Sequence, residues 1–184
     1  MRKESHILLW GSNLWYLGEG MLGPLFAIFS QRVGGNILDV AWAWATYMFV
    51  TGFLMIVVGK LSDGKFRKEK LMVIGFALNA FFTFAYLFVR TPMHLFFVQA
   101  GLGVAAALAY PTWEALFAKY ECKSTGGLVW GLANGEARIL TGIAIVIGGL
   151  IVNYFSFQTL FIVMGCVETV ATVYQARILR RSWL

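Results

Sequence analysis

The sequence predicts an all-α integral membrane protein with six transmembrane helices, and three observations support this prediction. Of the 184 residues, 59% are hydrophobic and only 13% are charged, with a mean hydropathy of +0.72. This composition is too apolar for a soluble domain of the same length. The chain also divides into six apolar runs, each long enough to cross about 30 Å of hydrocarbon. Finally, most basic residues lie in the connections between these runs.

The connections between the runs are short, so neighbouring spans are expected to run antiparallel. Gly23 and Pro24 should bend the first span near its far end, because Pro lacks a backbone donor and clashes with the preceding turn. The tight turns at residues 90–94 and 153–156 leave no room for an independent domain. The spans are expected at residues 7–29, 40–58, 71–89, 95–118, 128–152 and 157–174.

The distribution of Lys and Arg predicts the orientation. Arg32 and Arg90 fall on one side of the membrane, Arg138 falls inside the fifth span, and the other basic residues fall on the opposite side. Basic side chains are costly to carry across a bilayer, so the richer side is cytoplasmic. We therefore expect a plasma membrane protein of a prokaryote with both termini in the cytoplasm. The cytoplasmic set is Arg2, Lys3, Lys60, Lys65, Arg67, Lys68, Lys70, Lys119, Lys123, Arg177, Arg180 and Arg181.

The net charge of +6 does not indicate nucleic-acid binding, because the basic residues sit at span ends. Anionic lipid headgroups and membrane insertion account for that placement. The sequence contains no nucleotide-binding loop, catalytic triad or metal-ligand spacing. It therefore predicts neither an enzyme nor an ATP-driven pump, and we expect no cofactor and no metal.

Residues 59–70, between the second and third spans, contain five basic residues and an early Asp. Considered alone, this segment is a cytoplasmic loop with an Asp that caps a helix. Its order of residue types is more specific: glycine, any residue, leucine, a small residue, aspartate, and later two basic residues. The positions that carry this order are Gly59, Leu61, Ser62, Asp63, Arg67 and Lys68.

This order resembles the loop between the second and third helices of the major facilitator superfamily, with departures at Gly64 and Phe66. The fourth span is also similar to that family's fourth helix, since small residues over 99–106 precede Tyr110 and Pro111. The resemblance implies a secondary transporter that works by alternating access. It also implies that one domain, residues 1–184, consists of two inverted three-helix repeats at about 6–90 and 94–177.

Glycines in the second and fifth spans repeat the same spacing. Gly52 precedes Gly59 by the same seven residues that separate Gly142 from Gly149, and each pair begins after a Thr. The two spans would be equivalent in an inverted repeat, while small residues at this spacing also mark any close helix contact. We predict helix contacts at Gly52, Gly142, Gly148 and Gly149.

The resemblance covers only the first half of the usual twelve-helix transporter, whose two halves share one orientation. A second copy of this chain could replace the other half in a parallel homodimer. One alternative is that the chain is the N-terminal half of a longer transporter. Another is a six-helix membrane protein that does not transport and serves as an assembly or regulatory subunit.

The homodimer gives the 59–70 loop a role that the resemblance implies. Asp63 should face the start of the partner's fifth span, near residues 126–128, where exposed backbone N–H groups favour a carboxylate. Arg67 is expected to hold the carboxylate. This contact would act as a latch that closes the cytoplasmic side.

Ionisable side chains inside spans face protein or water rather than lipid. Counted at about 1.5 Å per residue from the cytoplasmic end, Arg138 lies about 15 Å deep and Glu19 about 20 Å deep. Glu136 and Glu168 lie about 10 Å deep, and Glu114 is shallower. Arg138 could therefore pair with Glu19 or with Glu168.

The resemblance places the first and fourth spans along the transport pathway. Glu19 is therefore the leading candidate for binding a small organic solute or a coupling proton. The alternative is that Glu19 and Arg138 form a pair that only fixes helix packing, and Glu168, on a peripheral span, is expected to be structural. The other candidates for solute or proton coupling are Arg138, Asn13, Trp15, Tyr110, Trp113 and Glu114.

Overall fold

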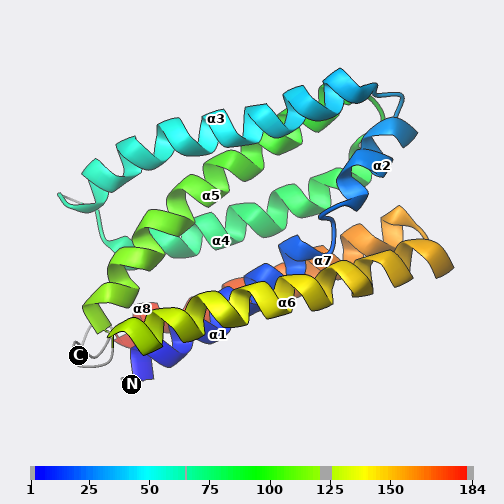
Figure 1. The fold of residues 1–184 in the computed structure, drawn as a ribbon. Coiled ribbons are helices and arrows are strands. Elements are labelled where there is room, and N and C mark those ends of the chain that lie inside the picture. The colour runs from blue at the N-terminus through cyan, green and yellow to red at the C-terminus, as the bar shows by residue number, and fades with distance from the viewer. Residues whose placement is uncertain (1–2, 65, 121–125, 182–184) are drawn as a thin grey trace.

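A computed structural model of the chain describes residues 3–64, 66–120 and 126–181, and over these residues every regular element is helical (Figure 1). Five helices are long and apolar enough to cross a membrane, and they coincide with the second to sixth expected spans. The elements are α1 (Lys3–Gly20), α2 (Leu25–Arg32), α3 (Ile37–Ser62), α4 (Lys68–Ala85), η1 (Tyr86–Phe88), α5 (Pro92–Tyr120), α6 (Gly126–Tyr154), α7 (Phe157–Gln175) and α8 (Arg177–Arg181).

The first expected span, residues 7–29, is not one bent helix, and this part of the prediction is wrong. α1 ends at Gly20, a four-residue turn follows, and α2 begins after Pro24. In the turn, Met21 and Leu22 donate their backbone N–H groups to Gly18 and Glu19 three residues earlier, at 3.3 and 3.4 Å. Pro24 has no N–H group to continue the α-helical ladder, which favours either a bend or a stop, and the structure shows a stop.

The start of α3 is fixed by a reciprocal cap that follows directly after α2. The Asn36 side chain accepts hydrogen bonds from the backbone of Leu38 and Asp39, and Asp39 accepts one from the backbone N–H of Asn36 at 2.8 Å. Gly34, at φ 89°, permits the tight turn that brings the chain to this cap. The sharp start of α3 therefore follows from local residues between 34 and 39.

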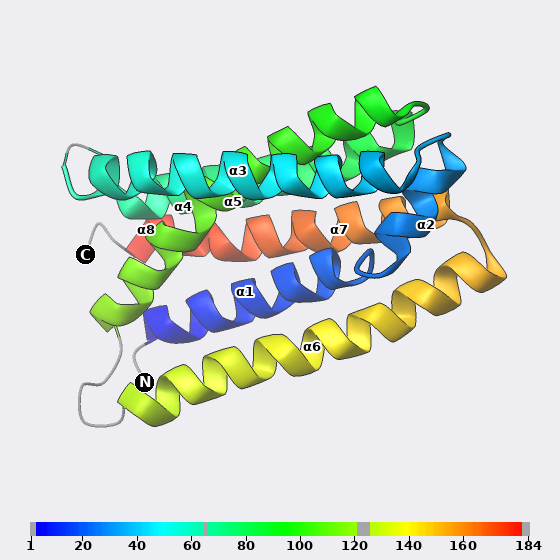
Figure 2. The ribbon, with the colours of Figure 1, turned by 45° about the horizontal axis from the view of Figure 1, so that its top comes forward.

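The helices pack as two groups joined at the back of the molecule. α5 packs against α3 and α4, while α1 packs against α6 and α7. α4 and α7 contact each other and connect the groups (Figures 1 and 2). α3 and α6 are the least buried of the long helices, since only 17% of the most apolar window of each is buried. They lie at opposite edges of the molecule.

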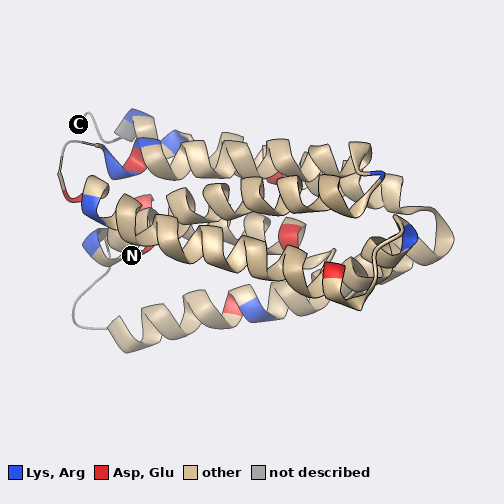
Figure 3. Ribbon diagram, turned by 90° about the horizontal axis from the view of Figure 1, so that it is seen from above, with Lys and Arg blue, Asp and Glu red and all other residues tan. Residues whose placement is uncertain are grey.

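Charged residues divide between the two ends of the bundle. The ends of the described chain and most Lys and Arg residues lie at one end, together with the connection from α3 to α4 (Figure 3). The end of α2, which carries Arg32, and the start of α5, which follows Arg90, lie at the other end (Figure 1). The two groups of basic residues that the sequence predicts on opposite sides of the membrane thus lie at opposite ends of the bundle. A few charged residues remain in the middle of the bundle, and they lead to the candidate site.

Candidate functional site

A cavity of about 360 Å³ lies between the two helix groups, and helices α1 to α7 and η1 all contribute to its wall. Its charged residues are Glu19 from α1, Arg138 from α6 and Glu168 from α7. Uncharged polar side chains and aromatic rings line the remainder. These are Tyr16, Phe26, Trp44, Tyr47, Asn79, Thr83, Tyr86, Gln99 and Thr141. The cavity thus combines opposite charges with aromatic surface between the two helix groups.

Glu19 is held by hydrogen bonds from three aromatic side chains. The Trp15 indole N–H donates to Glu19 Oε2 at 2.7 Å, one helical turn away on α1. The hydroxyl of Tyr110 donates to the same oxygen at 3.3 Å, and that of Tyr47 donates to Oε1 at 3.4 Å. The donors come from α1, α5 and α3, so this one carboxylate joins both helix groups.

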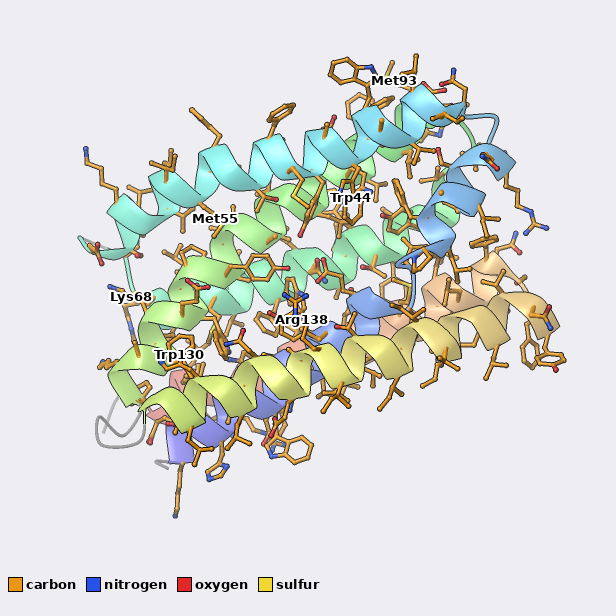
Figure 4. The ribbon with its side chains drawn as sticks, viewed as in Figure 1. Trp44, Met55, Lys68, Met93, Trp130 and Arg138 are labelled. Carbon is orange, nitrogen blue, oxygen red and sulfur yellow. The ribbon has the colours of Figure 1, made fainter. Side chains whose placement is uncertain are left out.

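Arg138 lines the same cavity as Glu19, but the two do not form the expected pair. Within the described part of the chain, Arg138 makes neither an ion pair nor a hydrogen bond. Its side chain extends from α6 toward the side where α4 and α5 lie (Figure 4). An arginine at this depth normally faces protein or water, so its guanidinium group can bind an anionic group that enters the cavity.

Glu168 occupies a different position from the one expected for a peripheral helix. Only 2% of its surface is exposed, and it lies in the cavity wall. Asn79 and Thr83, one turn apart on α4, face its carboxyl group. Sequence reasoning assigned this residue to packing, because the helix number alone does not reveal which face of α7 turns inward.

A smaller cavity of about 70 Å³ adjoins the first, with Tyr16 in the wall of both. It gathers four of the predicted site residues: Trp15, Tyr110, Trp113 and Glu114. The Trp113 indole N–H donates to the backbone oxygen of Leu8 at 3.0 Å, which ties α5 to α1. The predicted wall residues of the first and fourth spans therefore lie together.

Asn13 lies outside both cavity walls and has a structural contact instead. Its side-chain amide donates to Glu136 Oε2 at 2.7 Å and so connects α1 to α6. The amide oxygen of Asn13 is buried and has no hydrogen-bond partner among the described residues. Glu136, which sequence reasoning left without a role, is the partner of this residue.

The loop that contains the sequence motif lies at the end of the bundle where the basic residues gather. Asp63 caps the C-terminal end of α3, with its backbone N–H donating to Gly59 at 3.3 Å. Its carboxylate pairs with Lys68, whose Nζ lies 2.8 Å from Oδ1 (Lys68 is labelled in Figure 4). The Nε of Arg67 lies 3.8 Å from a carboxylate oxygen of Glu69. Leu61 is exposed.

The four glycines predicted at helix contacts divide into two kinds. Gly148 lies directly against the backbone carbonyl of Met21, in the turn between α1 and α2. At Gly52, Gly142 and Gly149, by contrast, an added Cβ would meet no described atom within 4 Å. Of these four glycines, only Gly148 contacts another described residue of the chain in this way.

Several cavity residues were not predicted, above all Asn79, Thr83 and Gln99. Each is 2% exposed although polar. Their polarity inside apolar spans was the available signal, because such side chains tend to face protein or a cavity. Among the described residues, no group of three His, Cys, Asp or Glu side chains is placed to hold a metal ion.

Comparison with known proteins decides the family. The profile of the Major Facilitator Superfamily matches residues 8–182. The chain belongs to this superfamily. Members are transporters rather than enzymes, so the expectation that the chain is not an enzyme is confirmed. With five helices that can span a bilayer, this superfamily member is an integral, multi-pass membrane protein.

Relatives of this superfamily member occur in archaea and bacteria. An uncharacterized MFS-type transporter, MJ1560, of Methanocaldococcus jannaschii is 26% identical over 157 residues, covering 85% of this chain and 40% of the relative. Multidrug resistance protein MdtG of Enterobacter lignolyticus is 22% identical over 170 residues, covering 90% and 40%. MdtG of Klebsiella pneumoniae is 20% identical over 169 residues, covering 90% and 41%. The chain thus spans about 40% of the length of these relatives.

Proposed function

We propose that this chain forms one half of a secondary transporter that moves a small organic solute by alternating access. The central cavity carries the proposal, because Glu19 and Arg138 provide opposite charges within about 360 Å³. Sites for small molecules typically measure about 300–1,000 Å³ and are mostly apolar with a few polar groups. Glu19 binds a positive or hydrogen-bond-donating group of the solute, and Arg138 binds an acceptor.

Two observations support an organic cargo. The cavity and its smaller neighbour are lined by aromatic side chains, including Trp15, Tyr110 and Trp113, which can pack against an organic solute. Two of the relatives are also named multidrug resistance proteins, and an organic solute would fit such names. In this proposal Glu114 and Asn13 support the wall, Asn13 through its bond to Glu136.

The transport test uses protein purified and reconstituted in vesicles, with a panel of fluorescent organic cations, zwitterions and anions as probes. Uptake of at least one probe above that of protein-free vesicles is expected. The same probe should quench the intrinsic fluorescence of the cavity tryptophans, because Trp15 and Trp44 lie in the two walls. Equal uptake by empty vesicles for the whole panel would contradict the proposal.

The packing of the helices supports two inverted repeats in a single domain, 1–184, with boundaries near 6–90 and 94–177. Exchanging α1 with α5, α3 with α6 and α4 with α7 converts the observed contacts into one another. For example, the contact of α1 with α6 becomes that of α5 with α3. In this arrangement α1 and α2 together make the first membrane crossing, which completes a set of six with the five long helices.

The second half of the transporter is proposed to be another copy of this chain, in a parallel dimer. The relatives are more than twice as long as the matched region, which indicates that a further unit of similar size completes the transporter. The sparsely buried helices α3 and α6 are its contact surface. Gly52, Gly142 and Gly149 face outward there and allow close approach of a partner helix.

Cross-linking tests this assembly in lipid bilayers. After Cys122 and Cys166 are replaced by Ser, Gly52→Cys and Gly142→Cys in one chain should form a disulfide-linked dimer on oxidation. Phe81→Cys, at an exposed position on α4, is the control and should stay monomeric. If Gly52→Cys and Gly142→Cys also stay monomeric, the homodimer is excluded and a different second half occupies this surface.

In the dimer, Asp63 is proposed to bind the start of the partner's α6 at residues 126–128 on the cytoplasmic side. The Asp63 side chain is 79% exposed despite its bond to Lys68, so it remains accessible to a partner. Leu128, 66% exposed, marks the corresponding accessible end of α6. The carboxylate would be stabilised there by the helix dipole and exposed backbone N–H groups.

Asp63→Asn is expected to shift the protein toward the inward-open state. A carboxylate at a helix N-terminus contributes about 0.3–1 kcal/mol, so the shift should be about two- to fivefold. This shift is measured with single cysteines placed at the two ends of the cavity. Their accessibility to a membrane-impermeant thiol reagent reports which end is open. Lys68→Met serves as the control, because it removes the bond within the loop and keeps the carboxylate. Equal effects of the two variants would show that no latch to α6 exists.

A further inference from the structure

A third cavity, of about 600 Å³, lies at the end of the bundle that carries Arg32. Its wall is built from the end of α2, η1, the end of α6 and the start of α7, which meet at this end (Figures 1 and 2). Among the described residues, Tyr86 alone lines both this cavity and the central one. The proposed transport function does not involve this cavity.

One part of the wall is a fixed aromatic cluster, and another is exposed apolar surface. Phe29, on α2, packs edge-on against Tyr86 and Phe161, with ring centroids 5.9 and 4.8 Å apart. All three rings are buried. By contrast, Ile28 on α2 is 54% exposed, and Phe155, directly after α6, is 74% exposed. Exposed apolar side chains of an integral membrane protein lie against lipid, so acyl chains have access to this cavity.

Arg32 is the only charged side chain among the described residues of this wall. Its guanidinium carbon lies 5.4 Å from the centre of the Phe157 ring, a cation–π contact that holds the group beside the cavity. It forms no ion pair with a described acidic residue. The first turn of α7 also borders the cavity and adds the partial positive charge of a helix N-terminus. An anionic group that enters therefore meets positive charge and no carboxylate of the wall.

An anionic phosphodiester that carries acyl chains matches both kinds of surface. A guanidinium group binds phosphate through two parallel hydrogen bonds, and Ile28, Val152 and Phe155 offer an apolar wall for a chain. The volume of about 600 Å³ falls within the range of about 300–1,000 Å³ that is usual for bound small molecules. A soluble anion would leave the apolar wall uncovered, whereas a phospholipid of the surrounding bilayer covers it.

We propose that this cavity binds an anionic phospholipid, with the phosphate group on Arg32 and an acyl chain along Ile28, Val152 and Phe155. The short helix α2 packs mainly against α3. A lipid bound in this cavity connects α2 also to the end of α6 and the start of α7, and so stabilises the position of α2. The lipid site does not rest on the proposed transport function.

Native mass spectrometry of the purified protein in detergent tests this site, with dioleoyl phosphatidylglycerol and dioleoyl phosphatidylcholine as probes. Phosphatidylglycerol should bind more tightly, because the choline cation offsets the phosphate charge of the other lipid. Arg32→Gln should weaken phosphatidylglycerol binding by about tenfold, the usual effect of removing a hydrogen bond to a charged group. Arg32→Lys should retain part of the affinity, since it keeps the charge but loses the paired hydrogen bonds.

Arg90→Gln is the matched control, because it removes a charge near the same end of the bundle from a residue outside the cavity wall. It should leave phosphatidylglycerol binding unchanged. Equal losses in Arg32→Gln and Arg90→Gln would overturn the proposal in favour of a general attraction of anionic lipid to this end. Equal affinity of the unmodified protein for the two lipids would also overturn it.

A second pair of variants tests the acyl-chain part of the site while Arg32 stays in place. Val152→Trp should weaken phosphatidylglycerol binding because the ring fills the cavity, whereas Val146→Trp, on the same helix but outside the wall, should not. Glycerol phosphate, which has the charged group without chains, should not displace the lipid. Full displacement would assign the site to soluble anions and overturn the proposal. If no solute probe is transported but lipid binding depends on Arg32, only the proposed transport function fails.

Discussion

Replacing Glu19 by Gln is expected to weaken binding of a cationic or hydrogen-bond-donating probe by about 10- to 100-fold. A hydrogen bond to a charged group contributes about 1.5–3 kcal/mol, and each 1.4 kcal/mol corresponds to about a tenfold change in the dissociation constant. The fold should survive, because the Gln amide oxygen can still accept from Trp15 and its NH₂ group can donate to the hydroxyl of Tyr47. Quenching of tryptophan fluorescence by the probe measures the constant.

Two other variants separate solute binding from packing in this experiment. Glu4→Gln makes the same chemical change near the start of α1 and should bind the probe like the unmodified protein. Glu19→Ala removes the acceptor of three donors, so it should lower thermal stability as well as binding. If Glu19→Gln bound the probe with unchanged affinity, Glu19 would have a role in helix packing and none in solute binding.

Gly148→Ala is expected to destabilise the protein by about 1–3 kcal/mol, the usual cost of overpacking a tight contact. The added Cβ would collide with the backbone carbonyl of Met21. A backbone atom cannot rotate away like a long side chain, so α6 or the turn after α1 must shift. Thermal unfolding in detergent, followed by circular dichroism, should show a lower midpoint.

Gly149→Ala is the matched control, since it changes the adjacent residue of the same helix. Its Cβ position is open within the described chain, and alanine favours the helix over glycine by about 1 kcal/mol. Its midpoint in dispersed monomers should therefore be equal or higher. Similar losses in both variants would show that helix propensity or lipid contact, rather than the contact with Met21, sets the stability here.

The long helices could be predicted from the sequence because their signal is local. Apolar runs and short connections placed the second to sixth spans, and the structure has a helix at each. The first span failed because Gly23 and Pro24 are compatible with either a bend or a full break. The outcome depends on Gly148, which accommodates the unwound turn from a helix more than a hundred residues away in sequence.

The sequence predicts several residues of the candidate site but not the contacts between them. Depth counting brought Glu19 and Arg138 to one level, and they do share a cavity. It could not give the rotation of each helix about its axis, which decides that Trp15, Tyr47 and Tyr110 hold Glu19. The same missing information hid Glu168, whose helix was expected at the periphery.

The interruption after Gly20 has a mechanical consequence for the first membrane crossing. An α-helix is held by bonds from each N–H to the carbonyl four residues earlier, and between α1 and α2 bonds over three residues, from Met21 to Gly18 and from Leu22 to Glu19, replace that ladder. α1, which carries Glu19, can therefore turn without forcing α2 to turn with it. The short α2 remains attached to the capped start of α3. The first membrane crossing therefore consists of two helices that can rotate independently, so a movement of Glu19 need not displace α2 at the other end of the bundle.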